Sequence, residues 1–417
     1  MKILVCHNYY KLRGGEDQCF EDEVAQLRDN GHEVVEYIRR NDDIDRNNQA
    51  SVAISTIWSR QSYREVRKLI QEHRPDVMHC TNTFPLITPS IYYAAKKESL
   101  PVVQALHNFR LVCPGAYLSR DGKVCEKCLG KSFAWPSIVH RCYRDSTPGS
   151  LAVASMLTSH RVMGTWKKSV HAYYTLTKFS RSKLLKLGMD PGRIVVKPNC
   201  VQPDPGIGSG EGDYVIFAGR LSSEKGIATM LESWTTQTPK IKLLVVGDGP
   251  MAGDVEKASH QSEMIEWVGQ QPFEEVLRLM GEAKAVIVPS VVYETFGRTI
   301  IEAYATGTPA IVSQFGAMQE LVLNGDTGLF FEVGNSVDLM AKVDQLLSDE
   351  SNRQRMRKLA RHEYENNFTA QHNFDCLLDI YELAIRNANY VSAPVASPKA
   401  ARPKSPSLGH PRPHAQD

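Results

Sequence analysis

Short runs of β-branched and other apolar residues alternate with longer amphipathic stretches along almost the whole chain. This alternation predicts parallel β-sheets covered by helices. The strands predicted in the first half are Lys2–Cys6, Glu33–Ile38, Asp76–Cys80, Pro101–Ala105, Ala172–Leu176 and Ile194–Val196. Those predicted in the second half are Tyr214–Ala218, Ile241–Val246, Ile265–Val268, Ala285–Pro289, Ala310–Ser313 and Gly328–Phe331. The predicted fold class is therefore α/β, with two Rossmann-like doubly wound domains that face each other across a cleft.

A segment rich in Pro and Gly separates the two halves. Seven of the fifteen residues of Pro198–Gly212 are Pro or Gly, which predicts a hinge linker. The two domains are accordingly expected at residues 1–197 and 213–367. Helical spacing predicts a further helix over 368–390 that closes back on the fold. Residues 391–417 are Pro-rich and almost without apolar side chains, so we expect a disordered tail there.

Composition excludes several classes of protein. The formal net charge of the 417 residues is +2, which argues against a nucleic-acid binder held by a bulk basic field. No apolar run approaches the roughly 18–20 residues that a membrane span needs. The first apolar run, Ile3–Cys6, is too short for the core of a signal peptide. The nine cysteines are expected to be mostly reduced, in a cytoplasm.

Two carboxylates mark the most informative segment, which follows the predicted strand Ala285–Pro289. Glu294 and Glu302 are separated by seven residues, with Gly297 at the turn that opens the next helix. The free amides of the first helical turn should then point into the space that both carboxylates border. Amides and the helix dipole can hold a diphosphate, while carboxylates accept hydrogen bonds from sugar hydroxyls. This arrangement suits a sugar nucleotide.

Two cations follow the predicted strand Tyr214–Ala218. Arg220 lies at the end of this strand and Lys225 lies where the next helix begins. Both are expected to neutralise a departing diphosphate, as a metal ion would elsewhere, so no catalytic metal is expected. At the end of the next strand, Gly247 is a small residue that lets a ligand approach the backbone.

Together these motifs resemble the family 4 retaining glycosyltransferases of the bacterial polysaccharide-biosynthesis type, which have the two-domain GT-B fold. Glu294 and Glu302 match the E-x7-E signature of that family. The resemblance implies that Glu294 contacts the donor sugar, that Glu302 contacts the ribose, and that Arg220 and Lys225 bind the diphosphate of a UDP- or GDP-type donor. It covers about residues 1–388.

Details of the E-x7-E segment refine this resemblance. Phe296 and Gly297, which lie between the two glutamates, are expected to contact the donor. Arg298 departs from the family, which commonly has an aliphatic residue there, and this difference bears on which sugar is held.

The first half is expected to form the acceptor side of the cleft. Gly14 and Gly15 lie between the first strand and the first helix, where a backbone can approach phosphate. The resemblance implies that this loop reaches the donor diphosphate, although a plain flexible turn would show the same residues. His107 ends the strand Pro101–Ala105 and matches the place where similar enzymes have a His beside the anomeric carbon, but a lone His is often structural.

A cysteine-rich insert is predicted at about residues 107–148. It contains Cys113, Cys125, Cys128 and Cys142, of which the middle two form a C-x2-C pair. Four cysteines within thirty residues suit a tetrahedral structural zinc site. The outer spacings of 11 and 13 residues are not those of a standard zinc ribbon, so a set of unrelated buried thiols is the alternative.

Two further segments have charged patterns. The stretch Ile57–His73 places Arg60, Arg64, Arg67 and Lys68 on one helical face. This face is either simply solvated or a contact with anionic lipid headgroups on the inner face of the cell membrane. Asp43-Ile-Asp45 has the form of a metal–diphosphate D-x-D motif but lies far from the donor signature, so we give it no role.

The predicted function is transfer of a hexose-type sugar, with retention, from a nucleoside diphosphate sugar to a hydroxyl of a glycan or a polyprenyl-diphosphate-linked acceptor. The predicted catalytic residues are Glu294, His107, Arg220 and Lys225. The expected setting is cell-surface polysaccharide assembly, in the cytoplasm or peripheral on the membrane. A GT-B nucleotide-sugar epimerase and a non-catalytic nucleotide-sugar-binding protein are the alternatives, while a G-x-G-x-x-G dehydrogenase fingerprint is missing from both candidate loops.

Overall fold

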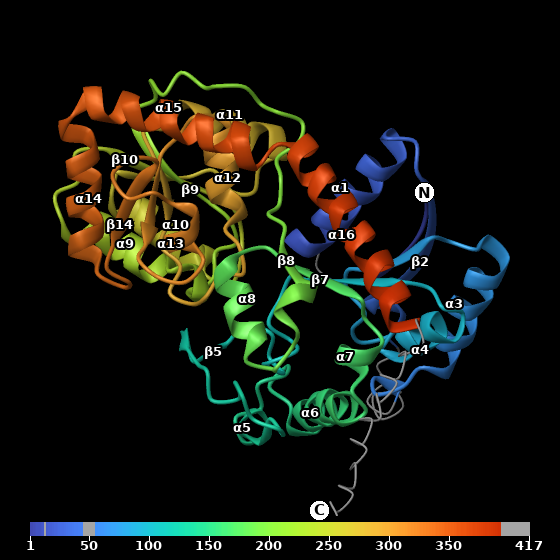
Figure 1. Cartoon of the computed structure of the whole chain (residues 1–417). Helices are drawn as coiled ribbons and strands as arrows, with labels where there is room; N and C mark the ends of the chain where they lie inside the picture. Colours follow the sequence, from blue (N-terminus) through green and yellow to red (C-terminus); the bar gives the residue numbers. More distant parts are fainter. Residues whose placement is uncertain (12–13, 45–54, 393–417) are drawn as a thin grey trace, which may run out of the picture.

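The structure is a computed structural model, which describes residues 1–11, 14–44 and 55–392. Figure 1 shows two α/β domains side by side, each built on one six-stranded sheet. The first sheet has the strand order β2-β1-β3-β4-β7-β8 and the second has the order β11-β10-β9-β12-β13-β14. All neighbouring strands in both sheets are parallel. The predicted fold class of two Rossmann-like domains is confirmed.

The predicted strands all exist, with small changes at their ends. In the first sheet they are β1 (Lys2–Tyr9), β2 (Glu33–Arg40), β3 (Val77–Cys80), β4 (Val102–Leu106), β7 (Ala172–Thr175) and β8 (Ile194–Val196). In the second they are β9 (Tyr214–Ala218), β10 (Lys242–Val246), β11 (Ile265–Trp267), β12 (Val286–Val288), β13 (Ala310–Ser313) and β14 (Gly328–Phe331). The cysteine-rich insert adds a short antiparallel pair, β5 (Ser119–Arg120) and β6 (Lys123–Val124).

The helices alternate with these strands. Those of the first half are α1 (Gly15–Asp29), α3 (Arg60–His73), α4 (Ser90–Lys97), α5 (Trp135–Val139), α6 (Thr147–Val162), α7 (Thr165–Lys168) and α8 (Lys178–Leu185). Those of the second half are α9 (Ile227–Thr236), α10 (Ala252–Gln261), α11 (Phe273–Glu282), α12 (Arg298–Ala305), α13 (Met318–Leu321), α14 (Ser336–Ser348), α15 (Glu350–Asn367) and α16 (Ala370–Ser392). Among the described residues, every helix is too short or too polar to cross a lipid bilayer.

Hydrophobic layers cover both faces of each sheet. In the first domain, one layer joins the sheet to α3, α4 and α6 through residues such as Val66, Ile91 and Leu157. In the second domain, α9, α10 and α14 cover one face, and α11, α12 and α15 cover the other. Burial on both faces explains why these strands are continuous apolar runs rather than alternating ones.

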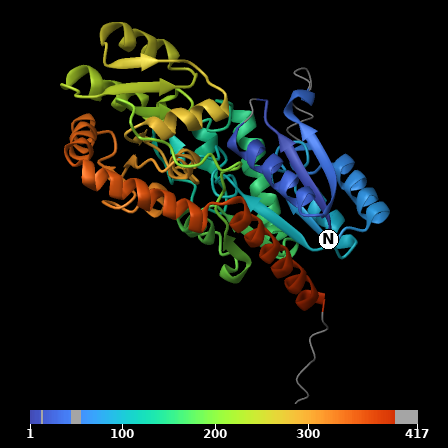
Figure 2. The same cartoon turned by 90° about the horizontal axis from the view of Figure 1, so that it is seen from above.

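The last helix crosses from the second domain to the first. Figure 2 shows α16 running from the end of α15 across to the sheet that contains the N-terminal strand. Its Phe374, Leu377 and Tyr381 are buried in one layer with Phe20 and Val24 of α1. The predicted closing helix is therefore present, and it completes the core of the first domain.

The predicted hinge is bound to the second domain along much of its length. The amides of Gly208, Gly210 and Gly212 donate to carbonyls of Thr306, Gly281 and Glu282, at 3.0, 2.9 and 2.9 Å. A Cβ added to Gly208 would lie 2.2 Å from the Gly281 oxygen, so this glycine allows two backbones to touch. The Pro and Gly content of the hinge therefore reflects close packing against the second domain as well as a connection between the domains.

Candidate active site

A cavity of about 580 Å³ opens at the carboxyl ends of the strands of the second sheet. Strands β9 and β12 are neighbours there although they are not consecutive in the chain, so the strand order reverses between them. Such a switch point is the usual ligand site of doubly wound sheets. The cavity volume lies within the roughly 300–1,000 Å³ of small-molecule sites. Its lining includes Arg220, Gly247, Gln271, Arg298 and Glu302.

Lys225 and Glu294 form an ion pair, and neither side chain is among the residues that line this cavity. The Nζ of Lys225 lies 2.6 Å from Oε1 of Glu294, and the Ser290 hydroxyl donates to the same oxygen at 2.7 Å. Burial would raise the pKa of Glu294, but the Lys225 charge and the hydrogen bonds from Lys225 and Ser290 together outweigh burial, so the pKa is lowered. Burial would lower the pKa of Lys225, but the charge and the hydrogen bond of Glu294 act in the opposite direction. The pKa of Lys225 is raised overall. Both groups are therefore charged at neutral pH.

Glu302 is buried in the first turns of α12, where it is paired with Arg298. The Nε of Arg298 lies 2.9 Å from Oε1 of Glu302, and its second terminal nitrogen lies 3.4 Å from Oδ2 of Asp22 in α1. Arg298 thus links the two domains at the cavity wall. Burial raises the pKa of Glu302, and Arg298 opposes that shift. Arg298, where the family commonly has an aliphatic residue, therefore lies beside Glu302. The resemblance assigns this place to the ribose.

At two positions near these site residues, the backbone conformation and close backbone contacts allow only glycine. Gly226, which follows Lys225, has φ 74°, and a Cβ there would lie 1.8 Å from the carbonyl oxygen of Pro289. Gly247 has φ 137°, and a Cβ there would lie 1.9 Å from the carbonyl oxygen of Gly219. Only glycine fits either position. The ends of β9, β10 and β12 consequently approach one another closely at the cavity.

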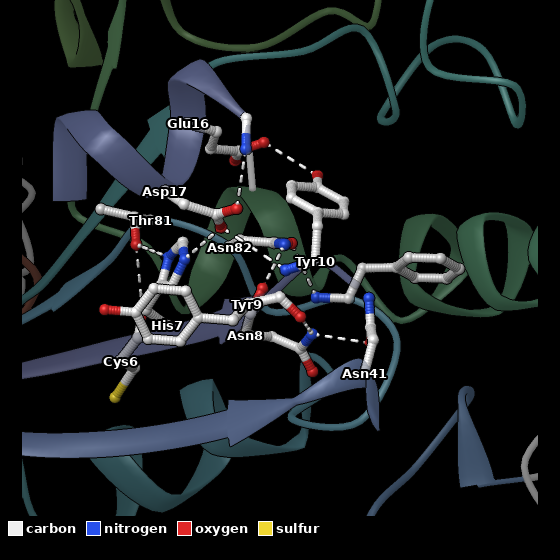
Figure 3. A network of polar contacts seen from close by, with 12 residues as sticks. Cys6, His7, Asn8, Tyr9, Tyr10, Glu16, Asp17, Asn41, Thr81 and Asn82 are labelled. Atoms are coloured by element: carbon white, nitrogen blue, oxygen red, sulfur yellow. Dashed lines mark hydrogen bonds and ion pairs between the residues drawn. The ribbon is translucent and has the colours of Figure 1, made fainter. Parts of the chain in front are cut away.

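The loop after β1 is fixed by a buried polar network, which Figure 3 shows from close by. His7 contacts Thr81 Oγ1 at 2.6 Å and Asp17 Oδ1 at 2.9 Å. The other oxygen of Asp17 accepts from the amide of Gly14 at 3.1 Å. Gly15 is the first residue of α1 rather than part of a free loop, and a Cβ there would meet no atom within 4 Å. The Gly14 amide thus already donates to Asp17, while the space around Gly15 is open.

His107 lies buried just after β4 with an unusual lack of partners. It is 7% exposed, and neither ring nitrogen has a hydrogen-bond partner in the part of the chain that the structure describes. Burial lowers its pKa to about 4, so the ring is neutral at pH 7. A neutral imidazole offers one donor and one acceptor, so its two ring nitrogens can pair with hydroxyl groups. His107 and Glu294 belong to opposite domains.

The contact that positions the Glu294 loop was not predicted from sequence. The hydroxyls of Thr177 and Ser180, at the start of α8, donate to the carbonyl of Thr295 at 3.1 and 3.0 Å. In return, the carboxylate of Glu320 accepts from the amides of Lys178 and Phe179 at 2.8 and 2.9 Å. Helix α8 of the first domain therefore holds the loop that carries Glu294. Phe296, in the same loop, is buried in the core of the second domain rather than lining the cavity.

The zinc prediction for Cys113, Cys125, Cys128 and Cys142 is not supported. In residues 1–11, 14–44 and 55–392, no group of three or more His, Cys, Asp or Glu side chains is arranged to hold a metal ion. All nine cysteines are free thiols. Burial, together with the neighbouring cysteines, raises the pKa of Cys128 to about 11 and also raises that of Cys142. The four cysteines nevertheless lie near one another, so they are neighbouring thiols rather than the unrelated thiols of the alternative.

The charges predicted to contact a membrane are partly paired within the chain. Arg67 Nε lies 2.6 Å from Glu98 Oε1, and Lys68 Nζ lies 3.5 Å from Glu72 Oε1. These acids reduce the positive field that α3 could offer to anionic lipid. Membrane contact stays a prediction. Of the discounted D-x-D motif, Asp45 lies outside the described residues.

Comparison with known proteins matches both domains. Residues 206–363 match the family "Glycosyl transferases group 1", and residues 14–200 match the "Glycosyl transferase 4-like domain". A curated relative, an uncharacterised glycosyltransferase of Methanocaldococcus jannaschii, is 23% identical over 84% of this chain and 89% of its own length.

Solved structures share the fold. Anabaena HepE in complex with UDP has a TM-score of 0.67 at 16% identity, over 92% of this chain and all of that one, and another structure of that protein contains UDP-glucose. WaaG, a glycosyltransferase involved in lipopolysaccharide biosynthesis, has a TM-score of 0.59 at 17% identity, over 94% of this chain and all of that one.

Proposed function

Because this chain belongs to the family 4, group 1 glycosyltransferases with the GT-B fold, we propose that it moves a hexose-type sugar from a nucleoside diphosphate sugar to a hydroxyl acceptor, with retention. The observation that carries this proposal is the 580 Å³ cavity at the switch point of the second sheet, with Arg220 and Glu302 in its wall. It offers a cation for a diphosphate and a carboxylate for a ribose at one site.

The donor in this proposal is of the UDP or GDP type. The HepE structures with UDP and UDP-glucose support UDP as the first donor to test. Glu302 accepts hydrogen bonds from the ribose hydroxyls and stays paired with Arg298. Glu294 orients the sugar. The open backbone at Gly15 leaves room for the diphosphate at the start of α1.

The reaction breaks the bond between the anomeric carbon and a phosphate oxygen, and the bonding electrons leave with the diphosphate. Arg220 and Lys225 stabilise that growing negative charge. They therefore stabilise the transition state more strongly than the ground state, which lowers the barrier. A new bond forms between the anomeric carbon and the acceptor oxygen. The acceptor proton passes to the departing phosphate oxygen on the same face, and neutral His107 holds the reacting sugar.

The proposed acceptor is a glycan or a lipid-linked glycan in cell-surface polysaccharide assembly. The lipopolysaccharide role of WaaG supports this setting, as does the resemblance to polysaccharide-biosynthesis enzymes. We place the reaction in the cytoplasm or at the inner face of the membrane.

A panel of radiolabelled UDP- and GDP-sugars, incubated with the full chain with and without glycan acceptors, tests the function. Acceptor-dependent transfer of label is expected. Release of an epimer without acceptor would indicate an epimerase instead. Tight UDP binding without any turnover would indicate a sugar-nucleotide sensor.

A further inference from the structure

A largely buried lysine of α8 contacts both domains. The side chain of Lys183 is 12% exposed, and its Nζ forms an ion pair with the carboxylate of Glu126. The same Nζ lies 4.7 Å from the centre of the Tyr293 ring and 4.9 Å from the centre of the Phe179 ring. Glu126 belongs to the cysteine-rich insert of the first domain, whereas Tyr293 belongs to the second domain and directly precedes Glu294. One cation therefore connects the insert to the loop that carries Glu294.

The Tyr293 ring crosses from the second domain to the first. Its centre lies 4.7 Å from that of Phe179, with the two rings edge to face at 64°. Tyr293 also packs against the hydrophobic layer of the first domain that contains Phe109. On the side of the second domain, its centre lies 5.7 Å from that of Phe315. Because this ring is the chain neighbour of Glu294, its seat between the domains also places that carboxylate.

Backbone hydrogen bonds hold Glu126 in a turn of the insert. Its carbonyl accepts from the amide of Leu129 at 3.0 Å. The amide of the preceding residue, Cys125, donates to the carbonyl of Leu118 at 2.7 Å. Leu118 is buried in the core of the first domain, and Leu129 packs against the same layer. The turn that presents Glu126 is therefore tied to the core of the first domain.

The charges at this contact favour keeping it intact. Burial would raise the pKa of Glu126. Hydrogen bonds from Lys183 and Tyr293 and the charges of Lys183 and Lys186 together outweigh burial, so this pKa is lowered. An ammonium over the face of an aromatic ring gains a cation–π attraction that increases as water is excluded. Loss of either partner would leave a poorly solvated charge without compensation.

We propose that the cysteine-rich insert positions the Glu294 loop for sugar transfer, by means of a clamp in which Lys183 holds Tyr293. Glu126 fixes the lysine in this clamp. The clamp complements the hydroxyls at the start of α8 that donate to the carbonyl of Thr295. Both chain neighbours of Glu294 are thus held by α8. The proposal rests on the glycosyl-transfer function and gives the insert a role at that site.

Steady-state kinetics of Lys183→Met in the full chain test the clamp, because this variant keeps the length of the side chain and removes its charge. With a donor and acceptor that the wild-type chain uses, kcat should fall about ten- to a hundredfold, since Glu294 is misplaced. The KM for the donor and the affinity for UDP should stay within about threefold of wild type. Lys183→Arg should restore most of kcat, because a guanidinium also pairs with a carboxylate and stacks on an aromatic ring. Tyr293→Leu should lower kcat as Lys183→Met does.

Hydrogen exchange measures the clamp without turnover. Amide exchange of residues 289–297 should rise at least about fivefold in Lys183→Met and return toward wild type in Lys183→Arg. The matched control is Lys186→Met. It removes an exposed lysine at the end of α8 whose Nζ lies 3.9 Å from Oε2 of Glu126, and it should change neither exchange nor kcat.

Urea midpoints show whether each variant folds. If Lys183→Met does not fold, Glu126→Gln takes its place and should show the same effects. The clamp is wrong if the variant leaves either the exchange of residues 289–297 or kcat at its wild-type value, or if Lys186→Met has the same effects. It is also wrong if UDP affinity falls as much as kcat, because the donor domain would then be damaged as a whole. A wild-type chain that neither binds nucleotide nor transfers sugar would overturn the proposed function, and exchange alone would then decide on the clamp.

Discussion

Lys225 and Glu294 are 69 residues apart in the chain, yet Nζ of the first lies 2.6 Å from Oε1 of the second. The pair joins the end of the turn after β9 to the loop before α12. Each group has been proposed to contact a different part of the donor, the diphosphate and the sugar. The two charges neutralise each other within the protein.

Lys225→Ala is expected to lower transfer of labelled sugar at least about 100-fold, because the departing diphosphate loses a preorganised cation. Glu294→Gln should lower it to a similar degree, since the donor sugar loses its carboxylate. The double variant should lose less than the product of both effects, because the two groups act as a unit. The control Lys242→Ala removes an exposed lysine of β10. Near-normal turnover in both single variants would contradict the assignment.

Arg298→Leu should destabilise the protein by about 3 kcal/mol at pH 7, because Asp22 and Glu302 then lose a shared counter-charge. The pKa values of both carboxyls are already raised, mainly by burial. Without Arg298 they should rise further, so the stability of the variant falls as pH rises from about 4 through these raised values.

Urea unfolding of the Arg298 variant at pH 5 and pH 8 measures this effect. The deficit relative to wild type should be larger at pH 8. Asp22→Asn combined with Arg298→Leu should recover part of it, because one uncompensated charge is removed. An equal deficit at both pH values would show that Arg298 acts through packing alone.

His107 should make the protein sensitive to acid. Burial lowers its pKa to about 4, whereas an unfolded histidine titrates near 6.5. Between these values the unfolded chain takes up a proton that the folded chain does not. Stability is therefore lost as pH falls from 6.5 toward 4, by about 1.4 kcal/mol per pH unit.

His107→Asn should reduce the loss of stability between pH 7 and pH 5 by about 2 kcal/mol in urea unfolding. The neighbouring Glu23, Lys197 and His79 remain in both proteins, so the difference reports the imidazole. His260→Asn, at an exposed position of α10, is the control. An unchanged pH profile in the His107 variant would show that the pKa of this ring is not lowered in the folded protein.

Gly226→Ala should destabilise the protein by about 3 kcal/mol or more, because a Cβ would meet the Pro289 oxygen at 1.8 Å and φ is positive. Gly253→Ala provides a matched comparison. Gly253 lies in α10, where a Cβ meets nothing within 4 Å, so that change should stabilise the helix by up to about 1 kcal/mol. Thermal melts compare the two, and equal melting temperatures would contradict the close packing beside Lys225.

The sheets could be predicted from sequence because their strands are buried on both faces and read as apolar runs. Strand β1 shows the limit of this signal: it continues through His7 and Asn8 to Tyr9. These polar residues are buried because Thr81, Asp17 and Asn41 satisfy them. Partners so far away in the sequence cannot be inferred from local pattern, and the prediction ended the strand at Cys6.

The residues of the candidate site that come directly after a strand could be predicted from the sequence. Arg220, Gly247 and Glu302 line one cavity because the carboxyl ends of parallel strands share one edge. The pairing of Arg298 with Asp22 spans 276 residues between two domains, and no local signal reports it. The cysteine spacing indicated a metal site, but in the described residues no group of three or more His, Cys, Asp or Glu side chains is arranged to hold a metal ion.

The path of α16 limits how this enzyme can be recombined with its relatives. The helix lies at the C-terminal end of the described chain, yet its Phe374, Leu377 and Tyr381 complete a layer with α1. A chimera spliced once between the domains would therefore set the helix of one parent against the sheet of the other. An intact chimera needs two splice points, so that the first sheet and α16 are transplanted together.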